Sequence, residues 1–249
     1  MKTLLLFLIA CFSIVSSNAQ KIGTTSGSNN QSSTTSSSSG LLGSFSNDEA
    51  VTAIKEVLSK GVTNAVNVVG VKDGYFKNNL IKIPFPKEAE IVESTLRREG
   101  AGKMADRVIE SLNRAAEDAA QAAKPILVNS IKQLTVTDAM NIVTGSQQDA
   151  ATQFLKRTTT EQLVTAFKPS IKKSLDKTLA TKYWKEATSL YNKVPMVRKV
   201  NTDLADYTTR KALDGLFIMI SKEEGKIRQD PKAFGSNIVD KVFGGLLGK

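Results

Sequence analysis

Residues 101–123 read AGKMADRVIESLNRAAEDAAQAA, and their periodicity predicts one long amphipathic helix. One broad face of this helix is apolar and rich in alanine: Met104, Ala105, Val108, Ile109, Leu112, Ala115, Ala116, Ala119 and Ala123. The opposite face is charged: Asp106, Arg107, Glu110, Arg114, Glu117 and Asp118. Because alanines let neighbouring helices approach closely, we expect this segment to be a central helix of a bundle, ending at Lys124-Pro125.

The same helical spacing extends in both directions from this segment. A capping box at Ser46 and Glu49 predicts a helix that ends at Gly70. Further helices are predicted at 88–99, 126–133, 137–143, 147–156, 161–178 with a kink or break at Pro169, 181–193, 203–224 and 231–243. Strand signals are nearly absent. The sequence therefore predicts an all-α fold, a single multi-helix bundle-like domain.

One segment departs from the helical pattern. Residues 81–86 read IKIPFP, and two prolines at this spacing exclude a helix interior. The alternating apolar residues fit a short strand, but no partner strand is evident in the sequence. We therefore predict an extended, proline-containing arm that packs on the helices.

The N-terminal residues have the parts of a secretory signal peptide. Lys2 is followed by an apolar run at 4–15 and then by small residues before a cleavage position after Ala19. The sequence thus predicts a signal peptide at 1–19 and export to the periplasm or beyond. The alternative is a lipoprotein, because the four residues that end at Cys11 fit a lipoprotein box, although the apolar run continues past this cysteine.

A polar stretch follows the predicted cleavage position. Residues 20–45 are rich in Ser, Thr and Gly, with an uninterrupted polar run at 23–40, which predicts a flexible, disordered tether before a helical domain at 46–249. No later apolar run reaches the length of a membrane span, about 18 residues. We expect the mature protein to be soluble or peripheral.

The amino-acid composition excludes most of the common catalytic groups. The 249-residue sequence has no histidine and one cysteine, which leaves with the signal peptide if cleavage follows Ala19. The mature chain then has no thiolate nucleophile, no imidazole base, no disulfide and no conventional zinc site. The composition disfavours an enzyme, and the sequence points to no metal and no cofactor.

Basic residues are concentrated in one part of the chain. Residues 156–199 hold 11 Lys and Arg against 3 Asp and Glu, a net charge of +8, whereas residues 40–155 and 200–249 are nearly neutral. Such a concentration attracts anions. For an exported protein, the expected partners are anionic lipid, acidic polysaccharide or a small anion, and nucleic acid is disfavoured. The sequence does not indicate an oligomeric state.

Aromatic residues accompany the lysines in this basic region. Tyr183 and Tyr191 lie on an apolar stripe with Trp184 beside it, and lysines flank the stripe. This pattern is typical of an amphipathic helix at a membrane interface. The alternative is that the stripe packs into the bundle and leaves the lysines as a solvated face.

Two readings fit the stretch FLKRTTTEQL, residues 154–163. The threonines and the following Glu161 and Gln162 form two overlapping capping boxes, which predict that one helix ends here and another begins. A helix N-terminus with basic residues and hydroxyls beside it also suits an anion. The candidate anion-binding residues in this region are Lys156, Arg157, Thr158, Thr159, Lys172 and Lys173.

Two other functions stay open at this point. The first is a helical protein-interaction scaffold of the cell envelope, which would expose a large apolar groove. The second is an enzyme built on carboxylates with Lys or Arg as the electrophile. Its candidate acids are Glu110, Glu117 and Asp118 beside Arg114, with isolated Asp138, Asp149 and Asp214 as further options. Charged residues spaced three or four positions apart are also common on solvated helix faces.

An ordered set of short motifs resembles a known family. The motifs are SLNRAAE at 111–117, KPI at 124–126, FLKRTT at 154–159 and ALDGLF at 212–217, with IKIPFP at 81–86 and IRQDP at 227–231. They resemble exported bacterial proteins grouped as domain of unknown function 4197. The resemblance implies one exported helical domain and no assigned chemistry. Its polar motif residues are Asn113, Arg114, Glu117 and Asp214, which are candidates for a site or for buried polar links between helices.

Overall fold

The structure is a computed structural model that describes residues 45–178, 180–193, 196, 199–200 and 203–245. The predicted signal peptide and all of the predicted tether except Phe45 lie outside these residues. The described helices are α1 (Asn47–Val69), α2 (Glu90–Arg98), α3 (Gly102–Ala120), α4 (Ala123–Lys132), α5 (Val136–Thr144), α6 (Ala150–Lys177), α7 (Ala180–Tyr191), α8 (Leu204–Gln229) and α9 (Asn237–Val239). Short turns η1 (Lys87–Ala89), η2 (Lys232–Phe234) and η3 (Asp240–Gly244) complete the elements. Since the described chain contains no strand, the predicted all-α class is confirmed.

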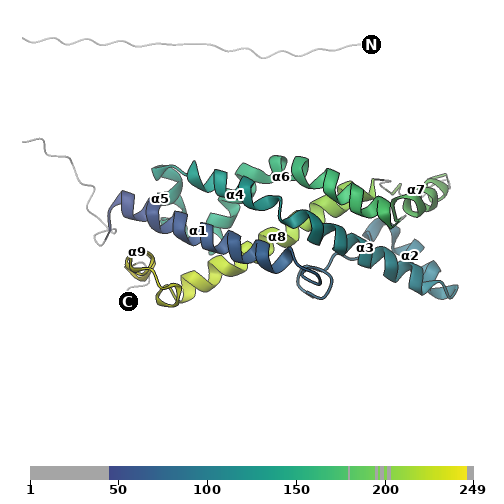
Figure 1. Cartoon of the computed structure of the whole chain (residues 1–249), viewed down its shortest axis with the longest axis horizontal. Helices are drawn as coiled ribbons and strands as arrows, with labels where there is room; N and C mark the ends of the chain where they lie inside the picture. Colours follow the sequence, from purple (N-terminus) through teal and green to yellow (C-terminus); the bar gives the residue numbers. More distant parts are fainter. Residues whose placement is uncertain (1–44, 179, 194–195, 197–198, 201–202, 246–249) are drawn as a thin grey trace, which may run out of the picture. The chain divides into compact units, whose positions relative to one another are not determined.

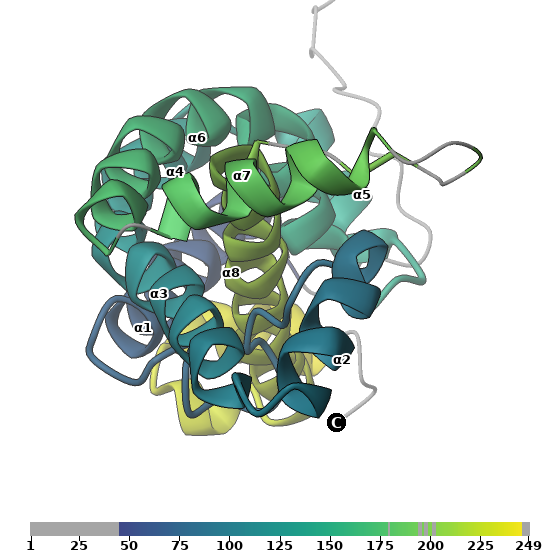
Figure 2. The ribbon, with the colours of Figure 1, turned by 90° about the vertical axis from the view of Figure 1, so that its right-hand side faces the viewer.

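The helices surround α8. This helix packs against α1, α3 and α6, and α6 also packs against α3 and α4 (Figure 1). In the view of Figure 2, α7 crosses in front of α8, with α1, α3, α4 and α6 on one side of α8 and α2 on the other. Among the described residues, no helix combines the length and the apolar character that a membrane crossing requires.

Local sequence signals explain where several helices begin and pack. At α1, the Ser46 hydroxyl accepts the Glu49 N–H at 3.2 Å and the Glu49 carboxylate accepts the Ser46 N–H at 2.8 Å, which confirms the predicted capping box. In α3, the alanines at 105, 115, 116 and 119 are at most 1 % exposed, as close helix packing requires. Met104 departs from the predicted apolar face and is 46 % exposed.

The predicted helix boundary within residues 154–163 is wrong, because α6 is continuous from Ala150 to Lys177 and also passes through Pro169. The hydroxyls of Thr158, Thr159 and Thr160 donate to carbonyl oxygens four residues earlier, at 2.9, 2.7 and 2.5 Å. Threonine hydroxyls that bond back along their own helix do not cap a new one. The two predicted capping boxes are therefore unused.

The predicted arm is confirmed at residues 81–86. Ile81, Ile83 and Phe85 are at most 5 % exposed, whereas Lys82 and Pro84 between them are exposed. In place of a partner strand, the Asn113 side chain on α3 accepts the N–H of Ile83 at 2.8 Å and donates to its carbonyl at 2.9 Å. One buried amide thus pairs with both backbone polar groups of Ile83.

The C-terminal region differs from the prediction of one helix over 231–243. Gly235 has φ +78°, a left-handed conformation that interrupts the helical path between η2 and α9. The α8 helix in turn continues to Gln229, past the predicted end at residue 224.

Glycine at position 215 allows α8 to pack tightly against the segment before the arm. An added Cβ there would lie 2.7 Å from Cε1 of Tyr75 and 3.1 Å from Cβ of Ile81. We predict that Gly215→Ala lowers the free energy of unfolding by about 1–3 kcal/mol, because both neighbours are fixed in the core. Gly225→Ala, in the same helix with nothing within 4 Å, is the matched control and should raise it by about 0.5–1 kcal/mol. Urea unfolding measures both, and equal changes would contradict the close approach.

Candidate functional site

Two of the motif residues on α3 hold a turn of the chain between α1 and the arm. The Glu117 side chain is 5 % exposed, and its Oε1 accepts the backbone N–H groups of Tyr75 and Phe76, both at 3.0 Å. Its Oε2 accepts a hydrogen bond from Arg114 at 2.8 Å. Glu117 does not lie on a solvated charged face of α3, and the alternative, a buried polar link, describes it. Its carboxylate is buried and fully engaged.

Arg114 extends this link to Asp73. The guanidinium donates to the Asp73 carboxylate at 2.7 Å and lies 5.1 Å from the centre of the Phe76 ring. Asp73 has φ 71°, a conformation that residues other than glycine rarely adopt. The hydrogen bond from Arg114, and then that from Lys77, holds the pKa of Asp73 below its ordinary value of 3.8. These contacts fix the turn that leads into the arm.

A second buried carboxylate joins the two longest helices. Glu224 of α8 is 2 % exposed and accepts the N–H groups of Ala151 and Thr152 at 3.0 and 2.8 Å, at the first turn of α6. Arg228 lies beside it at 2.9 Å. This arrangement caps α6 from another helix and matches the positive end of the α6 dipole. Glu224 was not among the predicted site residues, although it falls on the apolar stripe of α8, four residues after Ile220.

The candidate anion-binding residues do not form one site, because they occupy successive positions of a continuous helix and each step turns by about 100°. Lys156 lines a groove beside α8, whereas Thr159 is 1 % exposed with its hydroxyl bonded inside α6. Lys172 and Lys173 lie more than three turns beyond Thr159, where Lys172 pairs with Asp176 at 2.6 Å and Lys173 is exposed.

Arg157 and Thr158 line a separate polar pocket of about 360 Å³ between α4, α5 and α6. The Arg157 guanidinium lies 5.8 Å from the centre of the Phe154 ring, and the Thr158 hydroxyl is within 2.8 Å of that of Ser130. Asp138, which also lines the pocket, accepts hydrogen bonds from Thr135. The acid in the wall opposes the binding of an anion here.

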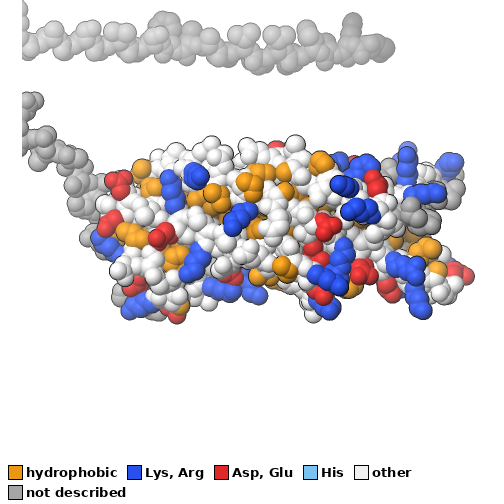
Figure 3. All heavy atoms as spheres, in the orientation of Figure 1, with side chains coloured by type: hydrophobic (Ala, Val, Ile, Leu, Met, Phe, Trp, Pro, Cys, Tyr) orange, Lys and Arg blue, Asp and Glu red, His pale blue; other side chains and the backbone are white. Residues whose placement is uncertain are grey.

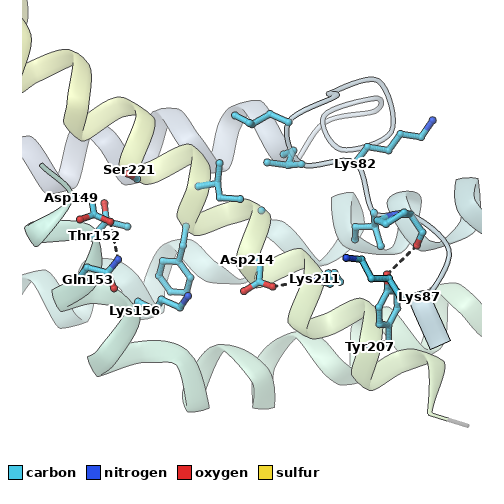
Figure 4. Close-up of a pocket in the computed structure, with 17 residues that line it drawn as sticks. Lys82, Lys87, Asp149, Thr152, Gln153, Lys156, Tyr207, Lys211, Asp214 and Ser221 are labelled. Carbon is cyan, nitrogen blue, oxygen red and sulfur yellow. Dashed lines mark hydrogen bonds and ion pairs between the residues drawn. The ribbon is translucent and has the colours of Figure 1, made fainter. Parts of the chain in front are cut away.

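The candidate site is a groove of about 680 Å³, which we call the α8 groove. Its floor is α8, and its two walls are the arm and the first two turns of α6. The lining residues are Leu80, Ile81, Lys82, Ile83, Pro84 and Lys87 from the arm and the positions that flank it, Asp149, Thr152, Gln153 and Lys156 from α6 and its N-cap, and Tyr207, Lys211, Asp214, Gly215, Phe217, Ile218 and Ser221 from α8. In the close-up, Lys87, Lys211 and Tyr207 gather toward one end and Lys156 and Gln153 toward the other (Figure 4).

The α8 groove is cationic. Four lysines line it, against two acids. Lys211 lies 3.5 Å from Asp214, whereas no ion pair to a described residue is formed by Lys82, Lys87 or Lys156. The Lys82 ammonium lies 4.7 Å from the centre of the Phe76 ring. The chemistry that fits this lining is the binding of an anionic group by unpaired ammonium groups.

The position of Trp184 does not suit a membrane interface. Its side chain is 4 % exposed and packs edge-on against Phe85 of the arm, with ring centres 5.5 Å apart. The proposed interfacial role for this residue is therefore corrected to a core contact. The side chains of Tyr183 and Tyr191 lie outside the described part of the structure.

The motif residues do not assemble a catalytic centre. Arg114 and Glu117 pair with each other, Arg157 lines the polar pocket and Asp214 lines the α8 groove. The other candidate acids are also separated or engaged, since Asp118 accepts the Ser174 hydroxyl at 2.8 Å. Within the described residues, no three His, Cys, Asp or Glu side chains are grouped closely enough to hold a metal ion.

The groove residues on α8 share one helical face, which is a signal the sequence contained. Tyr207, Lys211, Asp214, Ile218 and Ser221 recur at intervals of three or four. The basic region at 156–199 contains Lys156, whereas the three other lysines that line the groove lie outside that region.

The comparisons with known proteins bear on most of the chain. A family model described as "Protein of unknown function (DUF4197)" matches residues 44–244. No curated protein and no solved structure matches the chain.

We predict that Glu117→Gln lowers the free energy of unfolding by about 2–3 kcal/mol, because the buried charge that accepts from Arg114 and from two backbone N–H groups is lost. Glu110→Gln is the matched control on the same helix, since its carboxylate is 50 % exposed and lies 3.4 Å from the same arginine. That change should stay within about 0.5 kcal/mol. Chemical denaturation compares the two, and similar losses would show that burial of Glu117 contributes little.

Proposed function

The chain belongs to the DUF4197 family of proteins of unknown function, and we propose that it is an exported, non-enzymatic binding protein that holds an anionic ligand in the α8 groove. The observation that carries this proposal is the set of three groove lysines, Lys82, Lys87 and Lys156, that lack an acidic partner among the described residues. Export is supported by the signal-peptide pattern at 1–19.

Binding is favoured over catalysis by the roles of the acidic residues. The deeply buried carboxylates Glu117 and Glu224 hold the fold together. The acids in the groove also have partners, because Asp149 accepts the Gln153 amide at 2.8 Å and Asp214 lies near Lys211. A carboxylate enzyme would need two acids that converge on a reacting atom. By contrast, three of the groove lysines have no acidic partner among the described residues and can bind an anion without a rearrangement of the groove.

Inorganic phosphate is the probe for this proposal. In an NMR titration at low ionic strength, phosphate should shift amide signals of the arm and of α8, and the dissociation constant should rise with salt. Lys87→Gln and Lys156→Gln should each weaken binding by about threefold to fivefold. Lys222→Gln, an exposed lysine of α8 outside the groove, is the control and should leave it unchanged. Equal effects at all three positions would sink the proposal.

A second candidate is contact with an anionic membrane surface. Lys173 and Lys177 are exposed on one face of the C-terminal half of α6, and Lys182 and Lys185 are exposed on α7. None of the four forms an ion pair with another described side chain. Lys and Arg side chains gather over this end of the domain (Figure 3). A basic patch of this kind attracts acidic lipid head groups.

Vesicle sedimentation tests this second candidate. The protein should bind vesicles that contain phosphatidylglycerol and not vesicles of phosphatidylcholine alone, and salt should release it. The double variant Lys173→Gln, Lys177→Gln should bind roughly tenfold to thirtyfold more weakly, since each lysine near a charged surface contributes about 1 kcal/mol. The double variant Lys222→Gln, Lys226→Gln on α8 serves as the control. Equal binding to both kinds of vesicle would reject the candidate.

A further inference from the structure

Resting on the proposed function, we infer that the anionic ligand of the α8 groove is a single-chain lipid, with a negatively charged head group and an aliphatic chain that lies along α8. The proposed function requires lysines that bind the charge of the ligand. A lipid also requires apolar side chains in the groove that contact its aliphatic chain.

Exposed apolar side chains in the groove favour a ligand with an apolar body. Leu80 on the arm is 55 % exposed and Ile218 on α8 is 41 % exposed, and both line the groove. Phe217 and Ile83 form buried apolar surface beneath them, at 5 % and 1 % exposed. A sugar acid or free phosphate would leave Leu80 and Ile218 in water. An aliphatic chain would remove both from water, which stabilises the complex in proportion to the area covered.

The charges of the groove place the head group at the arm end. Lys87, next to the arm, and Lys211 of α8 lie at this end with one acid, Asp214, so this end has an excess of one positive charge. The Lys82 ammonium points away from them and lies 4.7 Å from the centre of the Phe76 ring. At the other end, Lys156 of α6 is balanced by an acid in the same wall, Asp149. Charge complementarity therefore favours an anionic head beside Lys87.

The spacing of residues on α8 predicts the length of the aliphatic chain of the ligand. Lys211 and Ile218 are seven residues apart, which corresponds to about 10 Å along the helix axis. Beyond Ile218 the lining becomes polar, with Ser221 on α8 and Thr152 and Gln153 on α6 (Figure 4). The apolar part of the groove thus accepts a chain of medium length. A longer chain would extend over polar side chains without further gain.

Calorimetry with straight-chain carboxylates, kept below their micelle concentrations, tests the inference. Affinity should rise about fourfold for each added methylene group from butanoate to octanoate, and it should level off between decanoate and laurate. Octanol, which has the chain without the charge, should bind at least tenfold more weakly than octanoate. Lys87→Gln should lower the affinity for all the carboxylates by a similar factor.

Variants of the apolar residues that line the groove distinguish binding of the aliphatic chain from binding of the charged head group. Leu80→Asn and Ile218→Asn should each flatten the dependence on chain length while phosphate binding stays as in the unmodified protein. Ile91→Asn on α2, where the side chain is 56 % exposed outside the groove, is the matched control and should keep the full dependence. Circular dichroism and urea unfolding confirm that each variant folds.

The outcomes distinguish the two proposals. Phosphate binding with no dependence on chain length overturns the lipid inference and leaves the proposed function standing. No binding of phosphate or of any carboxylate overturns both. Tighter binding of a glutamate hexapeptide than of octanoate also overturns the lipid inference, because it would show that the groove selects an acidic peptide.

Discussion

The fold depends on a carboxylate that has been taken out of water. Glu117 is nearly inaccessible on α3, and a buried carboxylate is tolerated only where hydrogen-bond donors surround it. The N–H groups of Tyr75 and Phe76 and the guanidinium of Arg114 provide those donors. One turn earlier on the same helix, Asn113 binds the backbone of Ile83. A short stretch of α3 therefore positions the whole segment between α1 and α2, including the wall of the α8 groove.

The parts of the fold that depend on local physics could be predicted from the sequence. The capping box at Ser46 and the extended arm at 81–86 involve neighbours in the chain, and both were predicted correctly. The boundary at Thr158 was wrong because a threonine can cap a new helix or bond back along an existing one, and the surrounding tertiary packing decides between the two. The sequence allowed both a solvated and a buried Glu117 for a similar reason. Its burial is set by residues some forty positions away, which the helical periodicity of α3 cannot reveal.

The candidate site was predicted only in part. The concentration of lysines in residues 156–199 is a property of the chain, but the structure spreads it over different faces of α6 and α7. The groove instead draws one lysine from that region and three from segments that are nearly neutral as a whole. Net charge along the sequence identified the kind of partner to consider. Helix packing determines the sign and the spacing of the charges in the groove. That arrangement of charges determines where the charged part of a ligand binds.

The cap that Glu224 supplies to α6 has a consequence for the order in which the protein folds. The donors at Ala151 and Thr152 precede their acceptor by more than seventy residues, so ribosome-bound chains that end before position 224 hold α6 with its first turn unsatisfied. Contacts of such long sequence separation form late, since a large loop must close first. The native cap of α6 therefore forms only after most of α8 has been synthesised.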